Sequence, residues 1–139
     1  MTPDPATIDR WVNRWVGTRH VYDGRDLDGV DCYGLVCRFF LDLYEIELPD
    51  WSRAGMAAPE LARMIAREKP NYWEPLAEPV EPCVALCHRV RMPHHMGIKW
   101  RGRIVHSIER GGVRTDLIDH FSAQIGRPEY GMIRALWHA

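Results

Sequence analysis

The chain has 139 residues, of which 46% are hydrophobic and 27% charged, and its formal net charge is −1. These values are typical of one globular domain, residues 1–139, that is large enough to bury a core. A nearly neutral chain is not expected to bind nucleic acid through a basic surface, and no apolar stretch approaches the roughly 18 residues of a membrane span.

The N-terminal residues lack the basic and apolar segments of a secretory signal. We therefore expect the protein to be made and folded in a cytoplasm. Its four cysteines are then expected to be thiols rather than a disulfide framework. They are Cys32, Cys37, Cys83 and Cys87.

The first half of the chain has helical periodicity. Helices are expected from Asp4-Pro5 to about Val16, from about Cys32 to Tyr44, and from about Pro59 to Lys69. A loop rich in glycine and aspartate, Thr18 to Val30, precedes the second helix. Proline and glutamate predict a surface loop from Asn71 to Pro82.

The second half of the chain has strand-like periodicity. Strands are expected at Cys83–His88, His95–Trp100, Arg103–Glu109 and Gly131–Trp137. Thr115–Phe121 fits a short strand or a turn of helix, and the charged run Arg110 to Arg114 is interpreted as a solvated turn. Helices followed by strands predict an α+β domain, with N-terminal helices packed on a C-terminal antiparallel sheet.

Cys32 lies where a loop turns into the second predicted helix. Asp31 is a favourable N-cap, so Cys32 falls in the first turn, among unpaired backbone N–H groups at the positive end of the helix dipole. Such a setting lowers the pKa of a thiol, and we expect Cys32 to be the most reactive cysteine, with a pKa below the usual ~8.5. A buried structural cysteine is the alternative interpretation.

Two histidines are expected to meet on neighbouring strands. A two-residue turn at Arg101-Gly102 would place Gly97 opposite His106. His95 would then lie diagonally across from His106 on the same face, at roughly 7–8 Å between Cα atoms. A slip of one residue would move His106 to the other face. Such a pair could serve as general base and orienting partner for a Cys32 thiolate.

A metal site is a further alternative, because several possible ligands lie close in sequence. They are Cys83, Cys87, His88, His94 and His95. On one strand, Cys83 and Cys87 would lie about 13 Å apart, which is too far to bind one ion. We therefore expect neither a metal nor another cofactor.

Together these residues resemble the NlpC/P60 family of papain-like cysteine peptidases. Asp31-Cys32-Tyr33-Gly34-Leu35-Val36 matches the family's Asp-Cys-Ser-Gly-Leu-Val stretch, and His95-Met96-Gly97-Ile98-Lys99 matches its His-Val-Gly-Ile-Tyr strand. His106 lies where the family often has a histidine. Other matches spread the resemblance over most of the chain: Trp15-Val16-Gly17, Gly24, Gly29 and Leu48-Pro49. It is particularly similar to the compact single-domain members encoded in phage tail modules.

The resemblance implies the papain-like NlpC/P60 fold and a cysteine endopeptidase that hydrolyses peptidoglycan stem peptides, typically between γ-D-glutamate and a diamino acid. Cys32 would attack the carbonyl, His95 would accept and return the proton, and His106 would orient His95. A tyrosine that many members use in the oxyanion hole is replaced here by His20, with Tyr22 two residues further on. Either side chain could donate a hydrogen bond.

The resemblance also implies partners and a location. The protein would be made in the host cytoplasm, join other phage tail proteins in the virion and act on the cell wall. The chain departs from the family at Glu81-Pro82-Cys83, where members usually have Gly-Asp, and its hairpin is one residue shorter. Two other functions stay open: a non-enzymatic tail assembly protein that retains the fold, and acyl transfer by the same residues.

Overall fold

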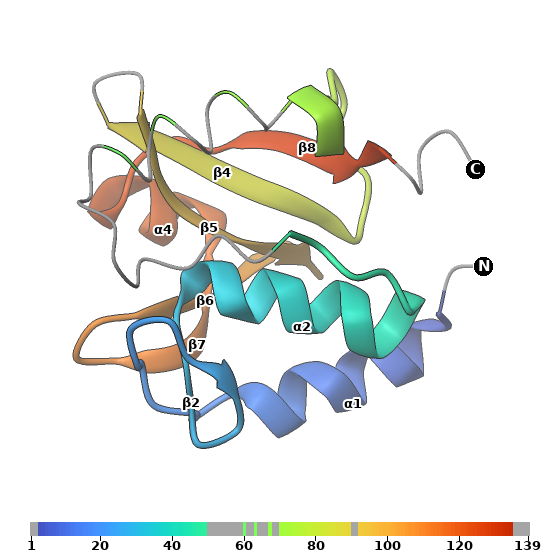
Figure 1. Ribbon diagram of the computed structural model, residues 1–139, viewed down its shortest axis with the longest axis vertical. Helices are drawn as coiled ribbons and strands as arrows, with labels where there is room; N and C mark the ends of the chain where they lie inside the picture. Colours follow the sequence, from blue (N-terminus) through green and yellow to red (C-terminus); the bar gives the residue numbers. More distant parts are fainter. Residues whose placement is uncertain are drawn as a thin grey trace.

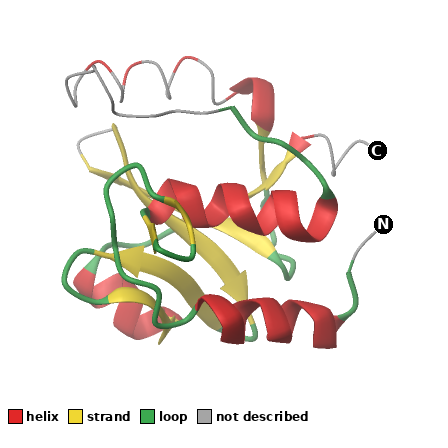
Figure 2. Cartoon of the chain, turned by 60° about the horizontal axis from the view of Figure 1, so that its bottom comes forward, coloured by secondary structure: helices red, strands yellow, loops and turns green. Residues whose placement is uncertain are grey.

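The computed structural model describes residues 3–49, 60, 63, 67, 70–89 and 92–134, with the backbone alone at residues 89 and 92–94. Helices α1 (Pro5–Trp15) and α2 (Cys32–Tyr44) lie side by side against one face of a six-stranded sheet (Figure 1, Figure 2). The short helix α4 (Ile118–Gln124) packs on the opposite face. The expected α+β architecture, with N-terminal helices on a C-terminal antiparallel sheet, is confirmed.

The main sheet has the strand order β3-β8-β4-β5-β6-β7, and each neighbouring pair is antiparallel. Its strands are β3 (Trp73–Pro75), β4 (Cys83–Arg89), β5 (Met92–Trp100), β6 (Arg103–Ile108), β7 (Gly112–Leu117) and β8 (Glu129–Ile133). A separate small ribbon pairs β1 (Arg25–Asp26) with β2 (Gly29–Val30) just before α2.

Successive residues of the central strands face two different cores, because side chains alternate along a strand. The face toward α1 and α2 buries Val84, Leu86, Ile98 and Val105 with the apolar stripes of both helices. The face toward α4 buries Ala85, Cys87 and Ile104 against Phe121. The side chain of His106 also lies on the face toward α4, and its ring centroid is 4.9 Å from that of Phe121.

Helix α1 is defined by its cap and by one apolar face. The Asp4 carboxylate accepts a hydrogen bond from the Thr7 N–H at 2.8 Å, as expected of an N-cap. Asp9 accepts hydrogen bonds from Trp100 Nε1 at 2.8 Å and from the Arg101 guanidinium at 2.9 Å. These bonds tie α1 to the turn between β5 and β6.

The β5–β6 hairpin has the predicted register. Trp100 pairs with Arg103 and Ile98 with Val105, across a two-residue turn at Arg101-Gly102. Both turn residues have positive φ, 51° and 70°, which suits the twist of a tight hairpin. Because side chains alternate between the two faces of a sheet, a slip of one residue would move His106 to the other face. The turn therefore decides which face His106 occupies.

Several predicted boundaries are corrected. The loop expected from Asn71 to Pro82 contains β3, whose Trp73 packs so closely on Gly131 that a Cβ there would lie 2.3 Å from the ring. The loop from Thr18 to Val30 contains the β1–β2 ribbon. Thr115–Phe121 spans the end of β7 and the start of α4. The last strand runs from Glu129 to Ile133, earlier than expected.

Apart from residues 60, 63 and 67, the helix predicted from Pro59 to Lys69 lies outside the described residues.

Candidate active site

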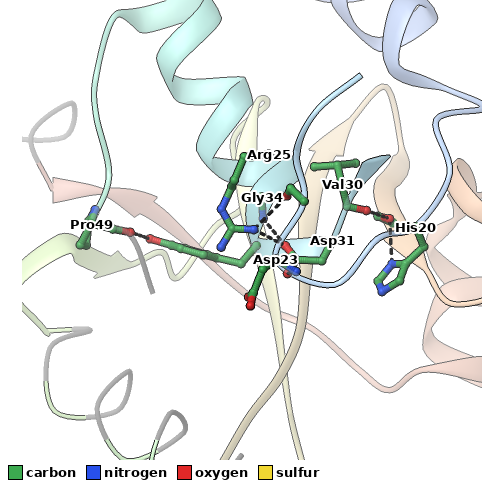
Figure 3. Close-up of polar contacts among 10 residues, drawn as sticks. His20, Asp23, Arg25, Val30, Asp31, Gly34 and Pro49 are labelled. Atoms are coloured by element: carbon green, nitrogen blue, oxygen red, sulfur yellow. Dashed lines mark hydrogen bonds and ion pairs between the residues drawn. The ribbon is translucent and has the colours of Figure 1, made fainter. Parts of the chain in front are cut away.

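Cys32 begins helix α2, at the position that the sequence predicts. The side chain of Asp31 caps the helix, because its Oδ1 accepts a hydrogen bond from the Gly34 N–H at 2.7 Å. The same oxygen accepts from Arg25 Nη1 at 2.8 Å, and Oδ2 accepts from the Asp23 N–H at 2.9 Å (Figure 3). Asp31 therefore joins the first turn of α2 to the loop before it.

Gly34 allows that loop to approach the helix. A Cβ at this position would lie 2.2 Å from the Gly24 carbonyl oxygen and 2.8 Å from Arg25 Nη1. Both distances are shorter than any side-chain carbon tolerates, so the loop would have to move away. The glycine two residues after Cys32 is thus needed for the geometry around the thiol.

The Cys32 sulfur lies against strand β5. It receives backbone N–H groups from Met96, from Tyr33 and from Cys32 itself, and Met96 directly follows His95. Burial of the sulfur raises the Cys32 pKa to about 11, with a further contribution from the Asp31 carboxylate. The expectation of a lowered pKa is therefore wrong for the substrate-free protein, because the N–H donors lower the pKa less than burial and the carboxylate raise it.

The structure brings His95 and His106 together. His95 Nε2 lies 2.8 Å from His106 Nδ1, and the two rings meet nearly at right angles with centroids 5.0 Å apart. His106 is fully buried. Gly97 makes room for this pair, because a Cβ there would lie 3.0 Å from His106 Cβ.

Asp116 and Arg114 extend the histidine pair, and sequence reasoning missed both. Asp116 Oδ2 lies 2.6 Å from His106 Nε2 and accepts a hydrogen bond from Arg114 Nε at 2.8 Å. Arg114 is thus part of β7 and not of a solvated turn. A signal was present in the alternation of β7, since His106 pairs with Arg114 and Asp116 shares the face of Arg114.

The ionisation states in this group follow from burial and hydrogen bonding. Burial lowers the pKa of His106, although Asp116 acts in the opposite direction. Burial would raise the pKa of Asp116, but hydrogen bonds from His106 and Arg114 outweigh it and lower that pKa. At neutral pH the group therefore contains a neutral His106 and a charged Asp116.

The two expected oxyanion residues occupy different settings. His20 Nδ1 lies 3.0 Å from Ser107 Oγ, and that hydroxyl donates to the Val30 carbonyl at 2.7 Å (Figure 3 shows His20 beside Val30). Since the hydroxyl proton is used, Ser107 accepts from the Nδ1–H of His20, which leaves Nε2 as an acceptor in the neutral ring. Tyr22 is 52% exposed, and a phenol hydroxyl can donate a hydrogen bond as well as accept one.

The other sequence candidates do not form a metal centre in the part of the chain that the structure describes, where no group of three His, Cys, Asp or Glu residues could hold an ion. The side chain of His94 is outside that part. Cys83 and Cys87 are buried on β4, and burial raises their pKa values to about 12 and about 11. Among the described helices, none combines the length and apolar character of a membrane span.

The sequence matches no family profile and no functionally curated protein. The structure is similar to the crystal structure of the NlpC/p60 domain of the peptidoglycan hydrolase SagA, with a TM-score of 0.66 and 17% sequence identity. The similarity covers 94% of this chain and 98% of that domain. At this identity the likeness shows the fold, and the chain has the NlpC/P60 fold that the sequence motifs predict.

Proposed function

We propose that the protein is a cysteine peptidase that hydrolyses peptide or amide bonds in peptidoglycan stem peptides. The observation that carries the proposal is that the Cys32 thiol, at the start of α2, receives the backbone N–H of Met96, the residue after His95. The pairing of His95 with a second, buried histidine supports it, as does the similarity to a peptidoglycan hydrolase domain.

In this mechanism Cys32 is the nucleophile and His95 is the base. His95 Nε2 is engaged with His106, so the mechanism assigns the thiol proton to Nδ1. Transfer within the pair is needed, because the raised pKa of Cys32 keeps the resting group protonated. The sulfur attacks the substrate carbonyl as the proton moves to His95.

The tetrahedral intermediate then collapses in the usual order of covalent catalysis. The backbone N–H of Cys32, at a helix N-terminus, would hold the oxyanion together with Tyr22 or a protonated His20. The carbon–nitrogen bond breaks, the amine leaves with the proton from His95, and a thioester remains on Cys32. Water activated by His95 hydrolyses the thioester, which releases the acid and restores the thiol.

We further propose that the bond cleaved joins γ-D-glutamate to a diamino acid, and that the protein acts on the cell wall as a phage tail component, made in the host cytoplasm and assembled with other tail proteins. The motif resemblance to compact tail-module members supports both statements. A transferase that delivers the same acyl group to an amine would use the same residues.

The test is to incubate the purified protein, with reductant, with defined stem peptides and to identify the products by mass spectrometry. We expect a new carboxyl and a new amine at one bond, and no products with Cys32→Ala. Addition of an amine acceptor separates hydrolysis from acyl transfer. If the wild-type protein cleaves no stem peptide or peptidoglycan fragment, with tail partners present, the chain is a tail component that kept the fold.

A further inference from the structure

We propose that Asp116 is a positioning residue that, through His106, decides which nitrogen of His95 carries a proton. The inference rests on the proposed function, because it concerns the base of the same site. It adds a residue on β7 to a group that otherwise consists of α2, β5 and β6.

The position of Asp116 is defined from two sides. Its Oδ2 is shared between His106 Nε2 at 2.6 Å and Arg114 Nε at 2.8 Å. Arg114 Nη2 in turn donates to Gln124 Oε1 of α4 at 3.1 Å. The carboxylate is thus held between β6, its own strand β7 and α4, with its side chain only 12% exposed.

A charged carboxylate accepts hydrogen bonds and cannot donate them. The proton between Asp116 and His106 therefore belongs to His106 Nε2. In a neutral imidazole the other nitrogen is then an acceptor, so His106 Nδ1 accepts from His95 Nε2–H across the 2.8 Å contact. His95 Nδ1 is left without a proton, as a base for the Cys32 thiol requires.

The reversed arrangement would disable the base. If His106 carried its proton on Nδ1, it would donate to His95 Nε2, and the neutral His95 would carry its proton on Nδ1. That nitrogen could not accept a proton from Cys32. Without an acceptor at His106 Nε2 the two arrangements become comparable in energy, so the carboxylate selects the active one.

The negative charge of Asp116 contributes less to this role than its ability to accept a hydrogen bond from His106 Nε2. The Arg114 guanidinium offsets the negative charge of Asp116, and the ring of His120 from α4 faces the other carboxylate oxygen, with Nε2 3.9 Å from Oδ1. Asp116→Asn should therefore preserve the proton arrangement, because Arg114 remains a donor that keeps the amide oxygen in place. Asp116→Ala removes the acceptor altogether.

The experiment reads the proton positions directly, by long-range 1H–15N correlation spectra of protein labelled with 15N-histidine, recorded above pH 7. We expect His95 and His106 of the wild-type protein both to carry the proton on Nε2. Asp116→Ala should convert each to a mixture of the two forms, and Asp116→Asn should remain close to wild type. Asp119→Ala, which removes an exposed carboxylate from α4, is the charge-matched control and should change neither ring.

The same variants have an expected effect on catalysis. Asp116→Ala should lower kcat roughly twofold with little change in KM, since about half of the His95 rings would remain competent as a base. Asp116→Asn should retain most of the activity.

A wild-type spectrum with the proton on Nδ1 of either histidine overturns the proposal without any variant. The proposal can therefore be tested even if Asp116→Ala does not fold. Unchanged proton positions in folded Asp116→Ala overturn it as well. Because these spectra do not depend on substrate, they separate this inference from the proposed hydrolase activity. A protein that shows the expected spectra but cleaves no stem peptide would have the proposed proton positions on His95 and His106 without the proposed hydrolase activity.

Discussion

Gly97 lies directly against His106, so that a methyl group added to Gly97 would come within 3.0 Å of His106 Cβ and 2.6 Å of the Val105 carbonyl oxygen. The contact allows the diagonal approach of His95 and His106 across the hairpin. A glycine in the middle of a strand is otherwise unfavourable, and here it serves the close approach of two rings.

Gly97→Ala should therefore separate β5 from β6 and displace His106 from His95. Overpacking of this kind costs about 1–3 kcal/mol, so we expect a lower midpoint in urea unfolding together with a loss of activity. Comparison of the folded fraction with the residual activity separates the two effects. A variant with wild-type stability and rate would show that the strands adjust without cost.

The proposed nucleophile and base should act as one unit. Cys32→Ala and His95→Ala should each abolish cleavage of stem peptides, and the double variant should be no worse than either, because losses within one catalytic unit do not add. His106→Ala should leave measurable activity, and His106→Asn or His106→Gln should retain more.

The control for these substitutions is Cys37→Ala, a second partly exposed cysteine in the same helix. It should cleave as well as wild type. Equal activity of Cys32→Ala and wild type would contradict the mechanism, whatever the other variants do.

Alkylation should show that the resting nucleophile is a thiol. Burial and the Asp31 carboxylate raise the Cys32 pKa to about 11, so its rate of reaction with iodoacetamide should still be rising above pH 9. Asp31→Asn, which keeps a capping side chain but removes the charge, should increase the rate at a given pH.

Peptide mapping of the same samples tests the selectivity of this reaction. Cys83 and Cys87 are buried and should be labelled only after unfolding. A rate at Cys32 that is already constant by pH 7 would show a preformed thiolate and contradict the structure.

The stability of the fold should decrease on acidification through the His106 pKa. Burial lowers that pKa below its value of 6.5 in an unfolded chain, so the unfolded state takes up a proton that the folded state does not. The free energy of unfolding is then fully retained above 6.5 and falls as the pH decreases below it. Asp116, whose pKa is lowered from 3.8, contributes a further loss only below that pH.

Thermal unfolding followed between pH 7.5 and 5 measures this slope. His106→Gln removes the titrating ring, so its melting temperature should depend less steeply on pH than that of wild type. Parallel curves for the two proteins would mean that His106 titrates alike in the folded and unfolded states.

Features that depend on nearby residues were predictable from the sequence. Helix α2 has the expected bounds because Asp31 caps it and its apolar residues recur at helical spacing. The Arg101-Gly102 turn set the hairpin register, and with it the meeting of His95 and His106, because two-residue turns allow few pairings. These local rules predicted the elements and the hairpin register, whereas the NlpC/P60 fold was predicted from the resemblance of the Cys32 and His95 motifs to that family.

Features that depend on the sum of distant contacts were decided by the tertiary structure. The strand β3 exists because Trp73 packs on Gly131 of β8, which no local pattern indicates. The Cys32 pKa is raised, although the sequence predicts a lowered one. The helix terminus that lowers this pKa is a local feature, whereas the burial that raises it comes from the whole fold. Asp116 and Arg114 join the site for the same reason: only the register of β7 on β6 brings a carboxylate to His106.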